Sequence, residues 1–323
     1  MSKVETWEFG AVLAMASSRE AFAGKILEMA GKNEDIFFID VDGAPVGSVQ
    51  DEFRKAYPDR FIEVGIAEPN AVGIASGLGL SGKIPFVCAF GPFLSIRTTD
   101  QIFLDIAYND VPARLVGTHS GLTSGGGPTH CAIIDIAVLR AMPNMTVVAP
   151  TDARQLELLL EKSIKYPGPM FIRVARGEEP LVYTNQDYDY EIGKSILTKD
   201  GTDVTAIGCG IGVFMCLQAA QILEKEGVSV RVIDMHTIKP LDIEAVLKAA
   251  AETRAIVTVE DHNVIGGLGS AVAEVLADNA CGIPLKRLGL TDEFAVLGDP
   301  EDLYKHYGYD SDGIISAIKK LIR

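Results

Sequence analysis

The 323-residue sequence is poor in cysteine and in basic residues. Its five cysteines are odd in number and include no C-x-x-C pair, so neither a disulfide framework nor a zinc knuckle is expected. Lys and Arg number 29 against 44 Asp and Glu, which gives a net charge of −15. This charge argues against nucleic acids and anionic membranes as partners, because both need a basic surface.

Long apolar runs are also missing. No stretch reaches the ~18 apolar residues of a membrane span, because Lys83 interrupts the longest candidate region. An apolar segment covers residues 9–16, but Glu5 and Glu8 precede it where a signal peptide carries positive charge. We therefore expect a soluble cytoplasmic protein, and the few cysteines fit a reducing compartment.

What the sequence does contain is an alternation of short apolar runs with helical patterns, over a length that suggests about two domains. Continuous Val, Ile and Phe runs with helices between them are typical of parallel sheets covered on both faces. In the first part, strands are predicted at 35–42, 61–66, 84–90, 114–119, 145–150 and 170–175. Helices are predicted at about 17–31, where Ser17 and Glu20 form a capping box, and at 68–80, 98–107, 131–141 and 152–163.

A polar, acidic and Tyr-rich stretch at 177–191 interrupts this pattern, with no sustained helical or strand period. The pattern then restarts, with strands predicted at 204–209, 228–235, 255–261 and 283–290, and helices at 212–226, 242–252, 268–278 and 311–322. We predict two doubly wound α/β domains with largely parallel sheets. Their boundaries are placed at 1–180 and 192–323, with a linker at 181–191.

Three glycine clusters invite comparison with nucleotide-binding loops. The G-x-G-x-x-G at 77–82 closes a helix, whereas a dinucleotide fingerprint opens one. The glycines at 208–212 follow a strand, and Asp234 lies where a ribose-binding acid would, but Val213 replaces the third glycine. The GGLG at 266–269 opens a helix. We interpret all three as tight turns or close backbone packing.

Chemically useful side chains gather where the strands of the first part end, the usual place for sites in parallel α/β domains. Glu68 stands at the entry of a Gly/Ala-rich helix, where an acid also simply favours the helix dipole. Phe90 and Phe93 flank a Gly-Pro turn and are either core residues or a stacking platform. His119 and His130 lie at the two ends of one glycine-rich loop, and this arrangement indicates a functional site.

The segments FIEVGIAEPN, FGPFL, GTHSGL, GGGPTH and LRAMPNMTVVAPTD, in this order, resemble the C-terminal half of a transketolase. More narrowly, the chain resembles the C-terminal subunit of split transketolases, which are made as two chains. The resemblance covers essentially the whole sequence. It implies a pyrimidine-binding domain followed by the family's C-terminal domain, thiamin diphosphate as cofactor, and a role in pentose phosphate metabolism.

By this resemblance, Glu68 hydrogen-bonds a ring nitrogen of the cofactor's aminopyrimidine, which then removes the thiazolium C2 proton. Phe90 and Phe93 match the aromatic pocket for the pyrimidine. Ile96 falls where many transketolases carry a third aromatic residue, so that part of the pocket is expected to be apolar. Asp42 matches an aspartate that lines the cofactor site across the subunit interface.

The resemblance also implies residues for the substrate. His119 and His130 match histidines near the thiazolium and the sugar, with roles in hydrogen bonding and proton transfer. Arg19 and Arg176 match arginines that grip the sugar phosphate, for which a guanidinium provides two parallel hydrogen bonds. For Arg176, a surface arginine at a strand end is an equally good interpretation.

Two departures from single-chain transketolases matter. The loop TSGGG at 123–127 lacks the usual acidic residue before GPTH, which leaves a branched or modified sugar phosphate open as the substrate. The G-D-G…N-N motif that holds the metal and the diphosphate is also missing. A diphosphate needs a cation or a nest of donors. We therefore expect no metal site on this chain. An N-terminal partner subunit would bring Mg²⁺ or Ca²⁺, in an assembly of two of each chain.

Other interpretations stay open at this point. The β subunit of a 2-oxo acid dehydrogenase has a similar architecture and length, but without GPTH. 1-Deoxyxylulose-5-phosphate synthase is similar but is one long chain that includes the metal motif. A catalytically decayed regulatory subunit is a third alternative, against which Glu68, His119 and His130 argue. The sequence names neither the sugars nor the partner chain.

Overall fold

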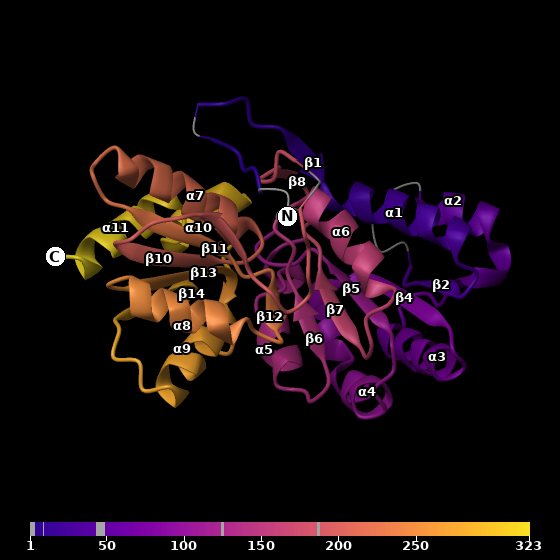
Figure 1. Cartoon of the computed structure of the whole chain (residues 1–323). Helices are drawn as coiled ribbons and strands as arrows, with labels where there is room; N and C mark the ends of the chain where they lie inside the picture. Colours follow the sequence, from indigo (N-terminus) through magenta and orange to yellow (C-terminus); the bar gives the residue numbers. More distant parts are fainter. Residues whose placement is uncertain (1–3, 9, 43–48, 124–125, 186–187) are drawn as a thin grey trace.

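The computed structural model describes residues 4–8, 10–42, 49–123, 126–185 and 188–323. Within these residues, the strands form sheets of seven, five and two strands. The two larger sheets lie side by side, and each lies between layers of helices (Figure 1). The structure thus confirms two α/β units with mostly parallel sheets.

The larger sheet has the strand order β12-β6-β7-β5-β4-β2-β3, and only the β12–β6 pair is antiparallel. Its strands are β2 (Ile36–Asp40), β3 (Phe61–Glu63), β4 (Ile84–Phe90), β5 (Arg114–Thr118), β6 (Thr146–Val148), β7 (Met170–Arg173) and β12 (Thr237–Lys239). All six strands predicted in the first part are present. The seventh, β12, was not predicted; it comes from the second half of the chain and covers the edge of β6.

Helices cover both faces of this sheet (Figure 1). On one side lie α1 (Ser18–Lys32), α2 (Val49–Ala56) and α6 (Ala153–Ser163), and on the other α3 (Glu68–Leu80), α4 (Thr99–Gln101) and α5 (Asp135–Arg140). Shorter 3-10 or π turns are η1 (Pro58–Arg60), η2 (Phe93–Arg97), η3 (Ile102–Ala107) and η4 (Pro128–His130). The capping box is confirmed for its serine, because the Ser17 hydroxyl accepts a hydrogen bond from the Glu20 N–H at 3.3 Å.

Two helix predictions for the first part were wrong in detail. The helix expected at 131–141 begins only at Asp135, because Cys131 is still extended after the η4 turn. The helix expected at 98–107 consists of a short α turn followed by π turns. The helix α2 was not predicted at all.

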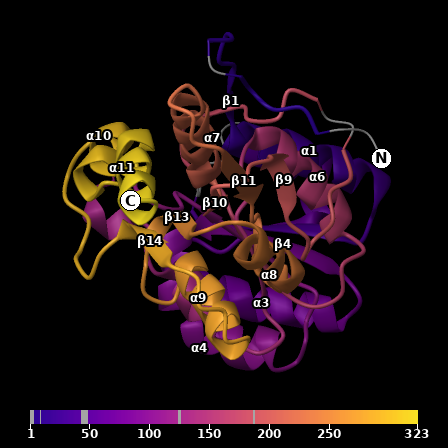
Figure 2. The ribbon, with the colours of Figure 1, turned by 60° about the vertical axis from the view of Figure 1, so that its left-hand side comes forward.

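The second sheet has the order β14-β13-β10-β11-β9, with only β9 antiparallel to its neighbour. Its strands are β9 (Ile196–Lys199), β10 (Val204–Gly208), β11 (Val230–Asp234), β13 (Ile256–Asn263) and β14 (Leu285–Leu290). The helices are α7 (Ile211–Glu224), α8 (Ile243–Glu252), α9 (Leu268–Asp278), α10 (Pro300–Tyr307) and α11 (Ser311–Leu321). Helices α10 and α11 lie next to each other at the left of the view in Figure 2, and the ring centroid of Tyr304 in α10 lies 5.4 Å from that of Tyr309, just before α11. Neither β9 nor α10 was predicted.

Several contacts join the two parts. Strand β1 (Met15–Ser17) pairs in antiparallel fashion with β8 (Glu178–Pro180). The expectation that residues 177–191 hold no strand was therefore wrong for β8. This pairing is non-local and leaves no local period. Tyr183 and Tyr188, in the predicted linker, are buried and stack at 4.7 Å. The segment therefore packs between the two parts of the chain.

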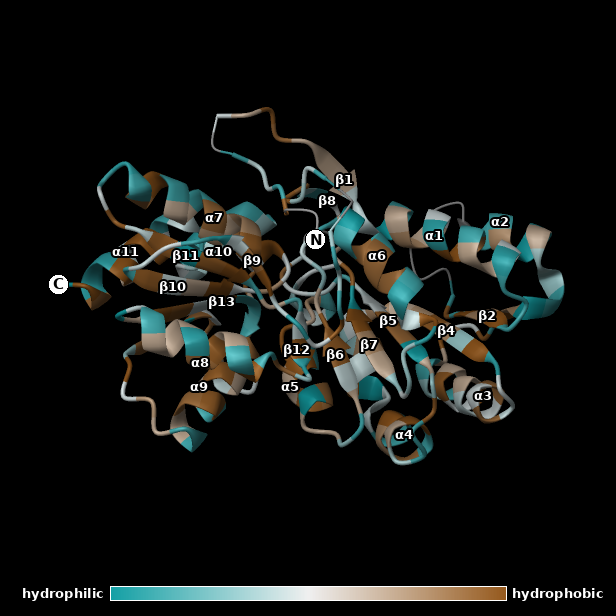
Figure 3. Cartoon of the chain, viewed as in Figure 1, coloured by the Kyte–Doolittle hydropathy of each residue, from teal (hydrophilic) through white to brown (hydrophobic). Residues whose placement is uncertain are grey.

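The core follows the apolar runs of the sequence. Strand β4, for example, has five successive buried residues between two half-buried ends. Figure 3 shows apolar residues concentrated on the central strands and polar residues on the outer faces of the helices. In the described part of the chain, no helix is both long and apolar enough to cross a membrane.

Candidate active site

The candidate site begins at Glu68, the first residue of α3. Strand β3 ends at Glu63, and the chain turns through Gly65, which has a φ of +65° that favours glycine. Glu68 is only 2% exposed. A buried carboxylate is stable only where hydrogen bonds and opposite charge compensate its lost hydration. The helix N-terminus contributes part of this compensation.

Arg97 supplies the rest. One of its guanidinium nitrogens, Nη1, donates to both carboxylate oxygens of Glu68, at 2.9 and 2.8 Å. The same guanidinium lies over the ring of Phe93, with Cζ 4.4 Å from the ring centroid. The Arg97 side chain is 44% exposed, so the Glu68 carboxylate is covered on its outer side by a group that solvent reaches.

Four rings form an edge-to-face cluster beside this ion pair. Phe90, at the end of β4, has its centroid 5.8 Å from that of Phe93, 4.4 Å from His119 and 5.5 Å from His130. Phe93 and His130 are 5.0 Å apart. Edge-to-face packing of this kind orients rings with respect to each other. The structure thus brings together the two phenylalanines and two histidines that the sequence singled out.

His119 follows β5 with a positive φ of +58°, which is unusual for a residue with a side chain. Its ring is buried, and Nδ1 lies 3.2 Å from the Thr118 hydroxyl. Burial, together with the nearby positive charges of Arg176 and Arg19, lowers the pKa of His119 to about 3. His119 is therefore a neutral hydrogen-bonding group at physiological pH.

His130 ends the η4 turn of the GPTH segment, and its ring is partly exposed. Its Nδ1 lies 3.1 Å from the Thr129 hydroxyl. Gly126 packs so closely on the His130 side chain that a Cβ there would come within 2.6 Å of the His130 Cβ. Ser124 and Gly125, in the loop that lacks the usual acid, lie outside the described residues.

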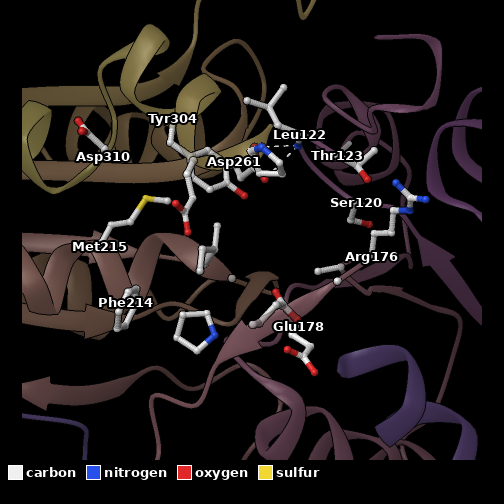
Figure 4. Close-up of a pocket in the computed structure, with 18 of the residues that line it drawn as sticks. Ser120, Leu122, Thr123, Arg176, Glu178, Phe214, Met215, Asp261, Tyr304 and Asp310 are labelled. Atoms are coloured by element: carbon white, nitrogen blue, oxygen red, sulfur yellow. Dashed lines mark hydrogen bonds between the residues drawn. The ribbon is translucent and has the colours of Figure 1, made fainter. Parts of the chain in front are cut away.

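The two predicted phosphate-binding arginines lie together. Arg19, in α1, and Arg176, just after β7, both line a cavity of about 1200 Å³ between the two halves of the chain. Figure 4 shows Arg176 next to Ser120 and Thr123, at the side of this cavity opposite Phe214 and Met215. Burial and the charge of Arg176 lower the pKa of Arg19. The positive charges of both arginines also lower the pKa of His119.

Two predicted residues are exposed at the surface of this chain. Asp42 is exposed, with a φ of +49°, and its N–H donates to the Glu63 carboxylate at 2.9 Å. The residues that follow it, 43–48, are outside the described part. Ile96 is 46% exposed on the surface of η2. Within the described residues, no hydrogen bond or ring contact links Asp42 or Ile96 to the ring cluster.

The space beside the glycine motifs of the second part is occupied by side chains of this chain. Glu260, within β13, accepts hydrogen bonds from the Leu268 and Gly269 N–H groups at the start of α9, at 2.7 and 2.8 Å. A Cβ at Gly267 would overlap this carboxylate. Asp234 is buried and accepts hydrogen bonds from Tyr183 and Gln155. The interpretation of these motifs as packing elements therefore agrees with the structure.

The cluster fits the aminopyrimidine that the sequence resemblance implies. A flat, nitrogen-rich group, the Arg97 guanidinium, already lies between the Glu68 carboxylate and the Phe93 face. The described residues include no group of three or more His, Cys, Asp or Glu side chains placed to hold a metal ion.

Sequence reasoning missed Arg97 and Asp261. Arg97 follows Phe93 by four residues, and this spacing places two side chains on one face of a helical turn. The segment between them lies just before the helix predicted at 98–107 and was not expected to be helical. The spacing alone was the available signal. Asp261, which accepts the Leu122 N–H at 3.0 Å, lies 139 residues away in sequence, so no local pattern points to it.

The comparisons with known proteins agree with this geometry. Residues 14–180 match the family described as transketolase, pyrimidine binding domain, and residues 193–314 match transketolase, C-terminal domain. The chain is 40% identical to an apulose-4-phosphate transketolase subunit of Phocaeicola vulgatus, over 96% of this chain and 98% of that protein. It is 39% identical to a 6-deoxy-6-sulfo-D-fructose transketolase subunit of Clostridium sp. (strain MSTE9), over 93% and 92%.

A solved structure described as a split gene transketolase, inactive beta4 tetramer, superimposes with a TM-score of 0.86. The two sequences are 38% identical, and the superposition covers 97% of this chain and 100% of that chain. These relatives favour the transketolase interpretation over the β subunit of a 2-oxo acid dehydrogenase. The chain belongs to the transketolase family and carries its pyrimidine-binding and C-terminal domains.

Proposed function

We propose that this chain is the C-terminal subunit of a two-chain transketolase, which transfers a two-carbon ketol unit between sugar phosphates. The observation that carries the proposal is the buried Glu68 carboxylate beside the Phe93 ring, with two histidines on an adjoining loop. The relatives that are named as transketolase subunits support it. Family membership implies dependence on thiamin diphosphate.

Each residue of the cluster has a role in this proposal. Thiamin diphosphate, when bound, supplies the carbon nucleophile of the reaction. Glu68 binds the aminopyrimidine ring nitrogen and holds or releases a proton at its carboxylate. Phe90 and Phe93 pack against the ring and exclude water, with Ile96 extending the apolar surface. Asp42 faces the cofactor site of a neighbouring subunit.

The histidines differ in environment, so we assign them different roles. His119 is neutral, because burial holds its pKa at about 3, and it orients substrate hydroxyls through hydrogen bonds. His130 is partly exposed and can carry a proton between substrate oxygens and solvent. Arg19 and Arg176 bind the substrate phosphate at the cavity edge.

The donor and acceptor are proposed to be sugars other than the usual ketose phosphates. The 123–127 segment carries no carboxylate that could meet the donor hydroxyls. Two relatives are named for an apulose phosphate and for a sulfonated fructose. These names support a modified or branched sugar substrate rather than a fixed place in pentose phosphate metabolism.

A partner subunit completes the proposed enzyme. The N-terminal subunit would hold Mg²⁺ or Ca²⁺ and the cofactor diphosphate, in an assembly of two of each chain around a self-associated dimer of this one. A relative described as an inactive tetramer of beta chains supports the need for such a partner. We also propose domain boundaries at residues 180 and 192. A cytoplasmic location is proposed as well, because the five cysteines are free.

The test compares the purified chain alone with the chain mixed with its N-terminal subunit. We expect ketol transfer by the mixture and none by the chain alone, when donor and acceptor sugars are screened by mass spectrometry. Tight, Mg²⁺-dependent binding of thiamin diphosphate by the isolated chain would overturn the partner requirement. Decarboxylation of 2-oxo acids by the mixture, without ketol transfer, would replace transketolase with a 2-oxo acid dehydrogenase component.

A further inference from the structure

The loop that carries the two histidines is held by a residue of the second sheet. The Leu122 N–H lies 3.0 Å from each carboxylate oxygen of Asp261, a residue within β13 (Figure 4). The Tyr309 hydroxyl donates to the same carboxylate at 2.8 Å, from the turn between α10 and α11. Asp261 thus joins the start of the loop to two elements of the C-terminal domain.

The backbone of the loop is shaped for this contact. Gly121 has a φ of +76°, and a Cβ at this position would overlap the Asp261 carboxylate. The Gly121 N–H donates to the Ala132 carbonyl at 3.1 Å, which brings the two ends of the loop together. Arg173 donates to the carbonyls of both Ala132 and Asp261, at 2.9 and 3.1 Å. Both ends of the loop therefore meet at Asp261.

His119 lies two residues before Gly121, in a strained backbone conformation. Such conformations persist only where the surroundings fix them on several sides. The Asp261 contact supplies one of these constraints. We propose that Asp261 is a positioning residue of the active site, which holds residues 119–122 so that His119 and His130 face Phe90. This inference rests on the proposed function and gives the C-terminal domain a part in it.

A purely structural role is the competing explanation. Burial raises the pKa of Asp261 to about 6, which shows that its charge is poorly accommodated. Buried charges are often replaceable by apolar residues without loss of stability. A buried carboxylate is therefore not needed for packing alone. Its oxygens are instead suited to accept hydrogen bonds from a backbone N–H and a hydroxyl.

The test uses Asp261→Ala and Asp261→Asn in the complex with the N-terminal subunit. The amide oxygen of the asparagine can accept from both Leu122 and Tyr309, because one carboxylate oxygen of Asp261 now serves both. We expect Asp261→Ala to lower kcat by about tenfold to a hundredfold, the equivalent of one hydrogen bond to a charged group. The Kd for thiamin diphosphate should change by less than about threefold, and Asp261→Asn should restore kcat.

Asp234→Ala is the matched control, because Asp234 is also a buried, hydrogen-bonded carboxylate of the second sheet but does not touch the loop. Equal losses of kcat for Asp261→Ala and Asp234→Ala would overturn the proposal. So would an unchanged kcat for Asp261→Ala. If Asp261→Ala does not fold, Tyr309→Phe takes its place, with a smaller expected loss of kcat.

Hydrogen exchange of the chain alone separates this inference from the proposed function. We expect the Leu122 amide to exchange at least about tenfold faster in Asp261→Ala than in Asp261→Asn or Asp234→Ala. Unaltered exchange in all variants would overturn the inference even if the complex is an active transketolase. If exchange is faster in Asp261→Ala but the complex of the unaltered chain shows no ketol transfer, the proposed function is overturned and the inference about Asp261 as a loop contact is not.

Discussion

Arg97 donates to both carboxylate oxygens of Glu68 while its guanidinium lies 4.4 Å from the centre of the Phe93 ring. An aminopyrimidine that hydrogen-bonds Glu68 and packs on Phe93 needs the same space. The two groups exclude each other, so binding of the cofactor ring requires Arg97 to move. Its partly exposed side chain has room to do so toward solvent.

Replacing Arg97 should therefore favour the cofactor. We expect Arg97→Ala to lower the Kd for thiamin diphosphate in the reconstituted complex by roughly tenfold, or ~1.4 kcal/mol, because no ion pair has to be broken. Isothermal titration measures the change. Arg97→Lys is the control, since lysine keeps the charge but lacks the flat fork. A weaker affinity in Arg97→Ala would mean that Arg97 takes part in binding.

Without cofactor, the same variant should be less stable. Arg97→Ala leaves the buried Glu68 carboxylate without its charged partner, and an unsatisfied buried acceptor costs about 1–3 kcal/mol. We expect the free energy of unfolding of the isolated chain to fall by that amount in urea titrations. The double variant Arg97→Ala/Glu68→Gln should recover part of the loss, and no recovery would contradict the pairing.

Glu68→Gln tests the proton role directly. Glutamine keeps the size and a hydrogen-bonding oxygen but cannot hold or release a proton, and general acid–base catalysis contributes about 10²- to 10⁴-fold. We expect a loss of kcat in that range at saturating thiamin diphosphate. Steady-state rates of the reconstituted complex measure it. An unchanged rate would remove Glu68 from the mechanism.

The buried Asp234 makes stability depend on pH. Burial raises its pKa to about 6 in the folded chain, above that of an unfolded aspartate. The folded state holds the proton more tightly, so its contribution to stability is full below pH ~4 and is lost as the pH rises to ~6. The loss is at most about 3 kcal/mol.

Urea unfolding at pH 4, 5, 6 and 7 measures this effect. Asp234→Asn is the informative variant, because one amide oxygen can accept from both Tyr183 and Gln155, which now share one carboxylate oxygen. We expect the difference between variant and original chain to grow in favour of the variant as the pH rises. A difference that is independent of pH would contradict the raised pKa.

His119 should not titrate near neutrality. Burial and the charges of Arg176 and Arg19 hold its pKa at about 3, so its ring stays neutral between pH 5 and 8. Two-dimensional NMR correlations of the imidazole nitrogens and carbon-bound protons report the protonation state at each pH. The spectrum of His119→Gln assigns the signal. A midpoint within this pH range would show that the ring is more hydrated than its burial indicates.

The fold was largely predictable because its strands are fully buried and read as continuous apolar runs. The bounds of β4, α3 and α9 are those expected from the sequence, since Glu68 marks the start of α3 and the glycines before Leu268 mark the start of α9. Helix α10 could also have been predicted, because Asp299 precedes it, Pro300 is its first residue, and Gly308 ends it in a left-handed conformation. Strands β1, β8 and β12 depend on partners far away in sequence and leave no local signal.

The site was predictable to the extent that its residues lie at strand ends. Phe90 ends β4 and His119 directly follows β5, so both follow this rule. The structure packs them into one cluster with His130, which lies in the η4 turn at the other end of the loop. The rule fails for Asp261, because its hydrogen bond to the Leu122 N–H is a tertiary contact between β13 and the loop that follows His119. Asp42 remains a prediction, since its proposed neighbour belongs to another subunit.

The antiparallel pairing of β12 with β6 has a practical consequence for any attempt to study the two halves separately. A chain shortened to its first 191 residues would leave the edge of β6 unpaired, with Val147 and Val148 in an apolar strand. Open apolar edges template strand addition between molecules. Such a fragment is expected to aggregate, and a graft of residues 237–239 onto its end, through a flexible tether, is the natural remedy.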